Sequence, residues 1–168
     1  MKGKLFIRIC DIKTLWQAWK KVKEKGSKGG IDNITIESFE KDIDKNLKLI
    51  KASLEKEQYI PEPVKRIYIP KIEKPEEKRA IALPSIKDKI VQEAVKMVVE
   101  PIFERIFLDC SYGYRPGKGP QKAIQKVVEY LKEGKTWVVT CDIENFFDSI
   151  NKNLLLSMFS KKIWRTIL

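Results

Sequence analysis

The residues best suited to chemistry lie in an acidic segment, Asp142-Ile-Glu-Asn-Phe-Phe-Asp148. This segment follows an apolar, β-rich stretch, Trp137 to Cys141, which is typical of a strand buried on both faces. A carboxylate at the end of such a strand is a rigid oxygen ligand, and Mg²⁺ usually takes one or two carboxylates plus substrate phosphates. Two such ions, about 3.5–4 Å apart, drive in-line phosphoryl transfer. The residues alone leave a second interpretation open, in which the segment is an acidic turn and Asp148 caps the last helix.

The elements that must position this segment follow from apolar periodicity. Apolar side chains spaced three and four apart predict helices over residues 11–25, 36–59, 86–107, 120–133 and 151–168. Thr35 is placed to cap the second of these, and Pro101 is expected to break or kink the third. Two alternating segments around a charged turn predict a β-hairpin over about residues 64–83, and the glycine-rich residues 111–119 predict a loop. The fold class is therefore α+β, mostly helical, with one hairpin and one further strand.

Composition and net charge narrow the range of functions that the chain can have. The 168 residues are 43% hydrophobic and carry a formal net charge of +11, so the chain has enough apolar side chains for a core and should attract polyanions, above all nucleic acid. The absence of histidine excludes Ser-His-Asp and Cys-His catalysis. Three widely spaced cysteines favour a reducing compartment, and no apolar run is long enough for a membrane span. We expect a cytoplasmic protein without a membrane partner.

Several blocks, in a fixed order, resemble one protein family. They are GGIDNITIESFE (29–40), PEPVKRIYIPK (61–71), KRAIALPSIKDKIVQEAV (78–95), EPIFERIFLDCSYGYRPGKGPQKAI (100–124) and WVVTCDIENFFDSI (137–150). Together they resemble the N-terminal portion of a bacterial reverse transcriptase of the group II intron, or maturase, type. The resemblance covers about residues 29–160. It departs from the family pattern at Asn33, which replaces a glycine, and at Tyr114, which replaces a phenylalanine.

The resemblance implies a right-hand polymerase fold. Residues 1–135 would form the fingers, with the hairpin at about 64–83, and residues 136–168 would begin the palm. Asp142 would be the first catalytic, metal-binding aspartate, and the backbone carbonyl of Ile143 would be a further ligand. The complete enzyme would use two Mg²⁺ ions to transfer a deoxynucleotide to a primer 3′-hydroxyl.

The same resemblance assigns residues to the incoming nucleotide. Phe147 would occupy the steric-gate position beneath the sugar, where an aromatic ring leaves no room for a 2′-hydroxyl, and Ile143 would also bind the nucleotide. Lys71 and Arg79 would contact the triphosphate, a task for which an ammonium and a guanidinium fork are suited. Arg115 and Lys118 would lie near the template path and contact phosphates. The implied partners are an RNA template, a DNA primer, a deoxynucleoside triphosphate and intron RNA.

The resemblance stops before the second and third palm motifs, which supply the remaining aspartates, and before the thumb. We therefore expect this chain alone not to polymerise DNA. A non-catalytic RNA-binding relic or subunit is the alternative, and a partner chain that supplies the missing strands is a third interpretation. The lysines of the first predicted helix likewise fit either RNA binding or simple solvation.

Overall fold

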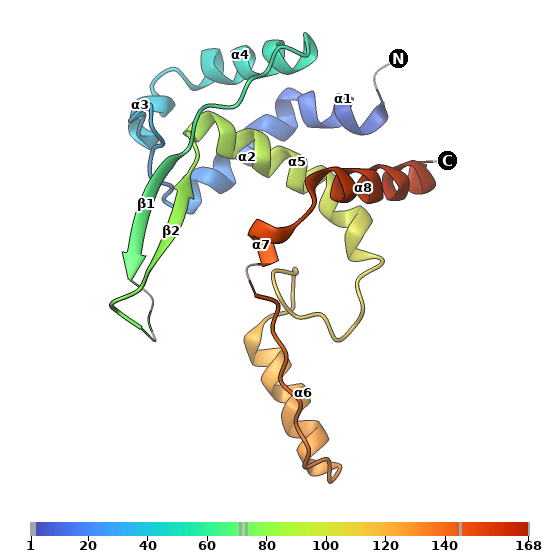
Figure 1. Ribbon diagram of the computed structural model, residues 1–168. Coiled ribbons are helices and arrows are strands. Elements are labelled where there is room, and N and C mark those ends of the chain that lie inside the picture. The colour runs from blue at the N-terminus through green and yellow to red at the C-terminus, as the bar shows by residue number, and fades with distance from the viewer. Residues whose placement is uncertain (1–2, 71, 73, 145, 168) are drawn as a thin grey trace. The chain divides into compact units, whose positions relative to one another are not determined.

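The computed structural model describes residues 3–70, 72, 74–144 and 146–167. By packing, the chain divides into two compact units, one up to Pro101 and one from Ile102 onward (Figure 1).

The first unit is built from helices and one hairpin. Its helices are α1 (Lys4–Cys10), α2 (Ile12–Glu24), α3 (Ile36–Glu40), α4 (Ile43–Glu55) and α5 (Ile86–Glu104). The predicted helix over 36–59 is in fact two helices, because Asp42 has non-helical backbone angles (φ −121°, ψ 36°) and interrupts it. Pro101 does not break α5, which ends three residues later, at Glu104. A proline so close to the end of a helix disturbs only the last turn.

The core of the first unit is the apolar stripe of α2 packed against α4 and α5. Leu15, Leu47 and Ile90 are fully buried, and the rings of Trp19 and Phe39 lie 5.3 Å apart. These side chains recur at helical spacing in the sequence, so the pattern predicted both the helices and the faces that they bury.

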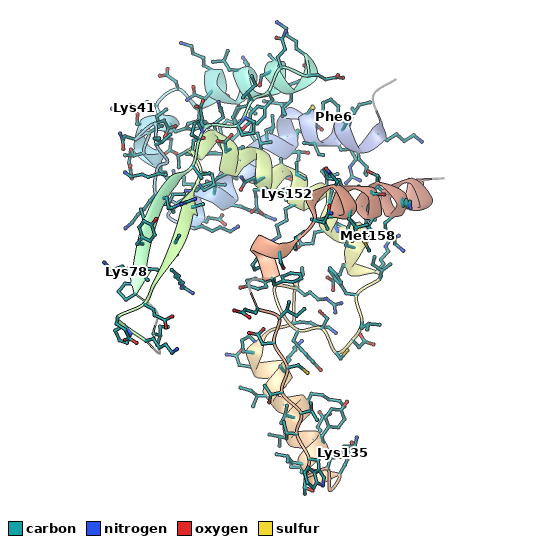
Figure 2. All side chains as sticks on the ribbon, viewed as in Figure 1. Phe6, Lys41, Lys78, Lys135, Lys152 and Met158 are labelled. Carbon is teal, nitrogen blue, oxygen red and sulfur yellow. The ribbon has the colours of Figure 1, made fainter. Side chains whose placement is uncertain are left out.

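The predicted hairpin is confirmed. Strands β1 (Lys65–Pro70) and β2 (Lys78–Leu83) pair antiparallel, with Ile67 opposite Ile81. The hairpin extends away from the helices of its unit (Figure 1), and Lys78 is among its exposed side chains (Figure 2). A two-stranded sheet is marginally stable by itself, so the hairpin depends on its attachment to the helices.

A buried carboxylate attaches the hairpin to α5. Asp88, only 3% exposed, accepts hydrogen bonds from the hydroxyl of Tyr59, from the backbone N–H of Glu62 (3.0 Å) and from the hydroxyl of Ser85 (2.8 Å). Burial and the hydrogen bond to Asp88 together raise the pKa of Tyr59 and keep its phenol protonated. The network therefore ties the segment that leads into β1 to the first turn of α5.

The glycine block before α3 packs tightly against the start of α5. Asn33 has a positive φ of 54°, a conformation that glycine adopts freely and asparagine tolerates, so asparagine can stand where the resemblance implies a glycine. Thr35 caps α3, as predicted, because its hydroxyl accepts from the Ser38 N–H at 3.2 Å. A Cβ added to Gly30 would lie 2.6 Å from the backbone nitrogen of Ser85.

We expect Gly30→Ala to lower the free energy of unfolding by about 2 kcal/mol, because the added methyl group meets backbone that cannot rotate away. Urea denaturation followed by circular dichroism measures this. Gly113→Ala is the matched control, since its Cβ would meet no atom within 4 Å, and it should cost less than about 0.5 kcal/mol. Equal effects of the two substitutions would contradict the close contact.

The second unit contains α6 (Pro120–Lys132), α7 (Phe146–Ser149) and α8 (Lys152–Ile167), after the end of α5. Pro120 begins α6 and Asn151 caps α8, since the Asn151 side chain accepts from the Leu154 N–H at 3.0 Å. The short helix α7 was not predicted. No helix in the described parts of the chain is both long and apolar enough to cross a membrane.

The predicted strand at Trp137 to Cys141 is wrong for this structure. These residues are extended, but they are not assigned to a strand, and among the described residues the only strand pairing is that of β1 with β2. Trp137 and Val139 are 96% and 88% exposed, whereas a strand in a central position would be buried. A strand needs neighbours for its backbone hydrogen bonds, and β-rich composition cannot supply them.

Candidate functional site

Part of the acidic segment at 142–148 lines a pocket of about 710 Å³ in the second unit. Its lining residues are Cys141, Asp142, Ile143, Phe146 and Phe147. The extended chain brings in the first three and the N-terminal turn of α7 brings in the two phenylalanines. Three residues that the resemblance assigns to metal and nucleotide binding, Asp142, Ile143 and Phe147, therefore lie around one cavity.

Asp142 is one of the residues that line this cavity. One oxygen, Oδ1, accepts from the backbone N–H of Ile143 at 2.9 Å, which holds the side chain against its own backbone. The other oxygen has no hydrogen-bond partner among the residues described. The pocket therefore has a carboxylate oxygen available to a cation, next to the exposed backbone of Ile143.

The two phenylalanines form the apolar side of the pocket. Their ring centroids are 5.3 Å apart and their planes are 65° apart, an edge-to-face contact that restrains both rings. Phe147 is 83% exposed and Phe146 47% exposed. A restrained aromatic ring of this kind can act as a steric surface for a ligand beside Asp142.

The two residues assigned to the triphosphate belong to the first unit. Arg79 is exposed on β2, opposite Ile69 of β1. Lys71, which follows β1, lies outside the described residues. Arg79 forms no ion pair among the described residues, so the guanidinium is accessible from solvent.

Arg115, for which the resemblance predicts a template phosphate contact, makes several contacts within its own loop. Its guanidinium is bound to both oxygens of Glu104 (2.7–3.2 Å) and to the backbone carbonyls of Leu108 (2.6 Å) and Ser111 (2.9 Å). It also lies over the ring of Phe107, and its side chain is only 7% exposed. These contacts give Arg115 a structural role, in which it holds the 104–115 loop closed, and its contact with a template phosphate stays a prediction.

Lys118 is also turned inward. Its ammonium donates to the backbone carbonyl of Asp109 at 2.8 Å and pairs with the Asp109 carboxylate at 3.3 Å. The ring of Tyr112 lies 5.4 Å from the same nitrogen, and the side chain is 22% exposed. The loop at 111–119, confirmed as a loop, therefore uses both of its predicted phosphate-binding cations in its own packing.

This arrangement predicts a pH-dependent contribution to stability. The hydrogen bond from Arg115 lowers the pKa of Glu104 below its ordinary 4.5. A carboxyl group with a lowered folded-state pKa stabilises the fold above its unfolded pKa and loses that effect as the pH falls through the folded one. We expect Glu104→Gln to lower the melting temperature at pH 7, and the difference from the wild type to vanish as the pH falls well below 4.5.

Melting curves between pH 7 and pH 3 test this expectation. The control is Glu76→Gln, at an exposed position in the hairpin turn, which should leave the melting temperature unchanged throughout. A Glu104→Gln difference that persists undiminished at pH 3 would show that the interaction does not depend on the charge of Glu104.

The partner of Arg115 was missed by sequence reasoning. Glu104 and Arg115 are eleven residues apart with no helix between them, so no periodicity links them. Asp88 was also missed, although Ser85-x-x-Asp88 has the spacing of a helix-capping box and gave a usable signal. No group of three or more metal-ligating carboxylate or thiol side chains occurs among the described residues.

Comparisons with known proteins fit this geometry. The model of the reverse transcriptase (RNA-dependent DNA polymerase) family matches residues 69–163, a span that includes β2, Asp142 and Phe147. The group II intron-encoded protein LtrA of Lactococcus lactis subsp. cremoris is 34% identical over 141 residues, which are 84% of this chain and 22% of LtrA. The protein YkfC of Escherichia coli (strain K12) is 31% identical over 151 residues, 82% of this chain and 39% of YkfC.

A more distant relative, also named for an intron, matches nearly the whole chain. The putative COX1/OXI3 intron 2 protein of Saccharomyces cerevisiae is 29% identical over 165 residues, 92% of this chain and 18% of that protein. The chain thus spans between 18% and 39% of the length of these curated relatives. Because the family model matches more than half of its residues, this chain belongs to the reverse transcriptase (RNA-dependent DNA polymerase) family.

Proposed function

We propose that this chain supplies the fingers and the first palm motif of a group II intron-type RNA-directed DNA polymerase. Residues 1–135 form the fingers and residues 136–168 begin the palm. The observation that carries the proposal is the pocket around Asp142, Ile143 and Phe147, within the segment that matches the family. In the complete enzyme the reaction is template-directed transfer of a deoxynucleotide to the 3′-hydroxyl of a DNA primer on an RNA template.

The residues present fit one Mg²⁺ ion. The Oδ2 atom of Asp142 and the backbone carbonyl of Ile143 are hard oxygen ligands, and Mg²⁺ commonly completes such a set with waters and substrate phosphates. When bound, the metal ions of this family would neutralise charge on the triphosphate and on the attacking and leaving oxygens. Asp142 then has two roles, to hold the cation and to orient it toward the nucleotide.

The other residues bind and orient the nucleotide. Arg79, and Lys71 outside the described residues, place positive charge on the hairpin for the triphosphate. The ring of Phe147 lies under the sugar and excludes a 2′-hydroxyl. The primer 3′-oxygen forms a bond to the α-phosphorus, while the bond to the leaving pyrophosphate breaks. Positioning and charge stabilisation supply the catalysis.

We further propose that the chain does not perform this reaction alone. Two ions about 3.5–4 Å apart need several carboxylate oxygens, and Asp142 is the one catalytic aspartate that the resemblance assigns to this chain. The resemblance places the remaining aspartates in the second and third palm motifs, which lie outside the part of the family pattern that this chain resembles. Such ligands would be contributed by further polypeptide.

Primer extension tests the proposal. Two proteins are compared on an RNA template with a DNA primer, deoxynucleoside triphosphates and Mg²⁺: this chain, and a chimera in which it replaces the matched segment of LtrA. We expect no product from the chain and Mg²⁺-dependent extension from the chimera. LtrA itself is assayed in parallel as the parent of the chimera, and circular dichroism verifies that the chimera is folded.

Two outcomes would contradict parts of the proposal. Extension by the chain alone would overturn its dependence on further polypeptide. A folded chimera that binds the RNA–DNA duplex but adds no nucleotide would favour the alternative, a non-catalytic RNA-binding subunit.

A further inference from the structure

We propose that a second site, a lysine-lined pocket between α2 and α5, binds a phosphate of the RNA backbone. The identity of this polyanion rests on the proposed function, whereas the site itself rests on separate geometry. The pocket, of about 330 Å³, lies wholly within the first unit. Among the residues that line it are Lys25, Ser27, Lys89, Gln92, Glu93 and Lys96.

The pocket combines cations from segments far apart in the sequence. Lys25 follows the end of α2, whereas Lys89 and Lys96 lie on α5, seven residues apart and so on the same face of that helix. Ser27 and Gln92 add neutral side chains that can donate hydrogen bonds. This lining has the mixture of charged and neutral donors that a phosphate group needs.

A single buried carboxylate organises these lysines without neutralising them. Glu93, whose side chain is 9% exposed, pairs with Lys25 at 2.8 Å and with Lys21 at 3.7 Å. Burial works to raise the pKa of Glu93, but Lys25, Lys96 and Lys21 together bring it below its ordinary value, so Glu93 is charged at neutral pH. One negative charge thus faces several ammonium groups, and the pocket keeps an excess of positive charge.

Lys89 shows this excess most clearly. Its ammonium donates to the backbone carbonyl of Lys28, and no carboxylate lies within ion-pair distance of it among the described residues. Partial burial lowers the pKa of Lys89, and the charge of Asp32, which lies beyond ion-pair distance, offsets only part of that effect. An anion in the pocket would supply a closer counter-charge, and it would also contact Lys96, whose partner Glu100 lies 3.5 Å away.

Binding of a labelled single-stranded RNA to the full chain, followed by fluorescence anisotropy over a range of salt concentrations, tests the site. The variant Lys89→Gln/Lys96→Gln should weaken binding about tenfold near 0.1 M salt. It should also reduce the slope of log K against log salt by about 0.7 for one lost phosphate contact. The matched control, Lys45→Gln/Lys48→Gln, removes the same charge from exposed positions of α4 and should weaken binding less than twofold.

The double variant Lys89→Arg/Lys96→Arg keeps both positive charges and should retain most of the affinity for RNA. Equal losses in the glutamine variant and the control would overturn the proposal, because they would show a diffuse effect of net charge. If the double variant is unfolded, Lys96→Gln alone is measured, and an unchanged affinity overturns the proposal in the same way.

Inorganic phosphate at about 10 mM distinguishes a small ligand from RNA. If it raises the melting temperature of the wild type but not of Lys89→Gln/Lys96→Gln, while RNA affinity is equal in both, the pocket binds a small phosphate compound and the RNA assignment fails. This assay does not involve Asp142. Weaker RNA binding by the glutamine variant, with an inactive chimera, would support the pocket and reject only the polymerase function.

Discussion

Asp142→Ala is expected to abolish primer extension by the chimera of this chain with LtrA, with a fall in rate of about a thousandfold or more, equivalent to about 4 kcal/mol. The physical reason is that alanine removes the carboxylate that would hold Mg²⁺ against the triphosphate. The Cα position and the α7 turn should not change, because Asp142 is exposed and bonds only to the adjacent Ile143 N–H among the described residues. Single-turnover extension kinetics at saturating Mg²⁺ measure the effect.

Glu144→Gln is the matched control for this prediction. It removes an exposed carboxylate two residues further along the chain and should change the rate less than about threefold. A comparable loss in both variants would mean that the general acidity of the segment matters. Full activity of Asp142→Ala would remove Asp142 from the catalytic role and with it the polymerase interpretation of the pocket.

Phe147→Ala is expected to have the second-largest effect, this time on the choice of sugar. The preference for deoxynucleotides over ribonucleotides should fall about tenfold to a hundredfold, or about 1.4–2.7 kcal/mol, because the ring that blocks the 2′-hydroxyl is gone. Its 83% exposure fits a ring that contacts a ligand rather than the core. The ratio of kcat/KM for the two nucleotide types in the chimera measures the change.

Phe146→Leu provides the comparison for Phe147→Ala. Phe146→Leu removes the ring that restrains Phe147 but leaves the Phe147 ring in place, so the fall in sugar preference should be smaller than in Phe147→Ala. An unchanged sugar preference in Phe147→Ala would exclude it from the steric-gate position, even if Asp142 proves catalytic. The two predictions therefore test separate parts of the same pocket.

The local elements were largely predictable. Helices α2, α5 and α6 and the β-hairpin lie close to their predicted ranges, and Thr35 caps α3 as expected. Each depends on residues a few positions apart, such as the three- and four-residue spacing of the stripe around Trp19. Such signals lie in residues that are close together in the sequence, because a helix or a tight hairpin makes most of its backbone hydrogen bonds within itself.

The prediction of a strand at Trp137 to Cys141 was wrong because a strand depends on a partner segment that can lie far away in the sequence. Its apolar, β-branched composition is real, but a strand exists only when a second segment pairs with it, and no described segment does so. Propensity describes which residues suit a sheet and cannot provide the neighbouring strand.

Family membership and the placement of Asp142 and Phe147 in one motif could be read from order and spacing along the chain, because the motif is contiguous. The inward turn of Arg115 and Lys118 could not, nor could the meeting of Lys25 with Glu93 across 68 residues. A charged side chain that looks solvated in the sequence becomes a structural partner or part of a pocket only when folding brings a distant group within about 3 Å. That encounter depends on how whole helices pack, which no local pattern specifies.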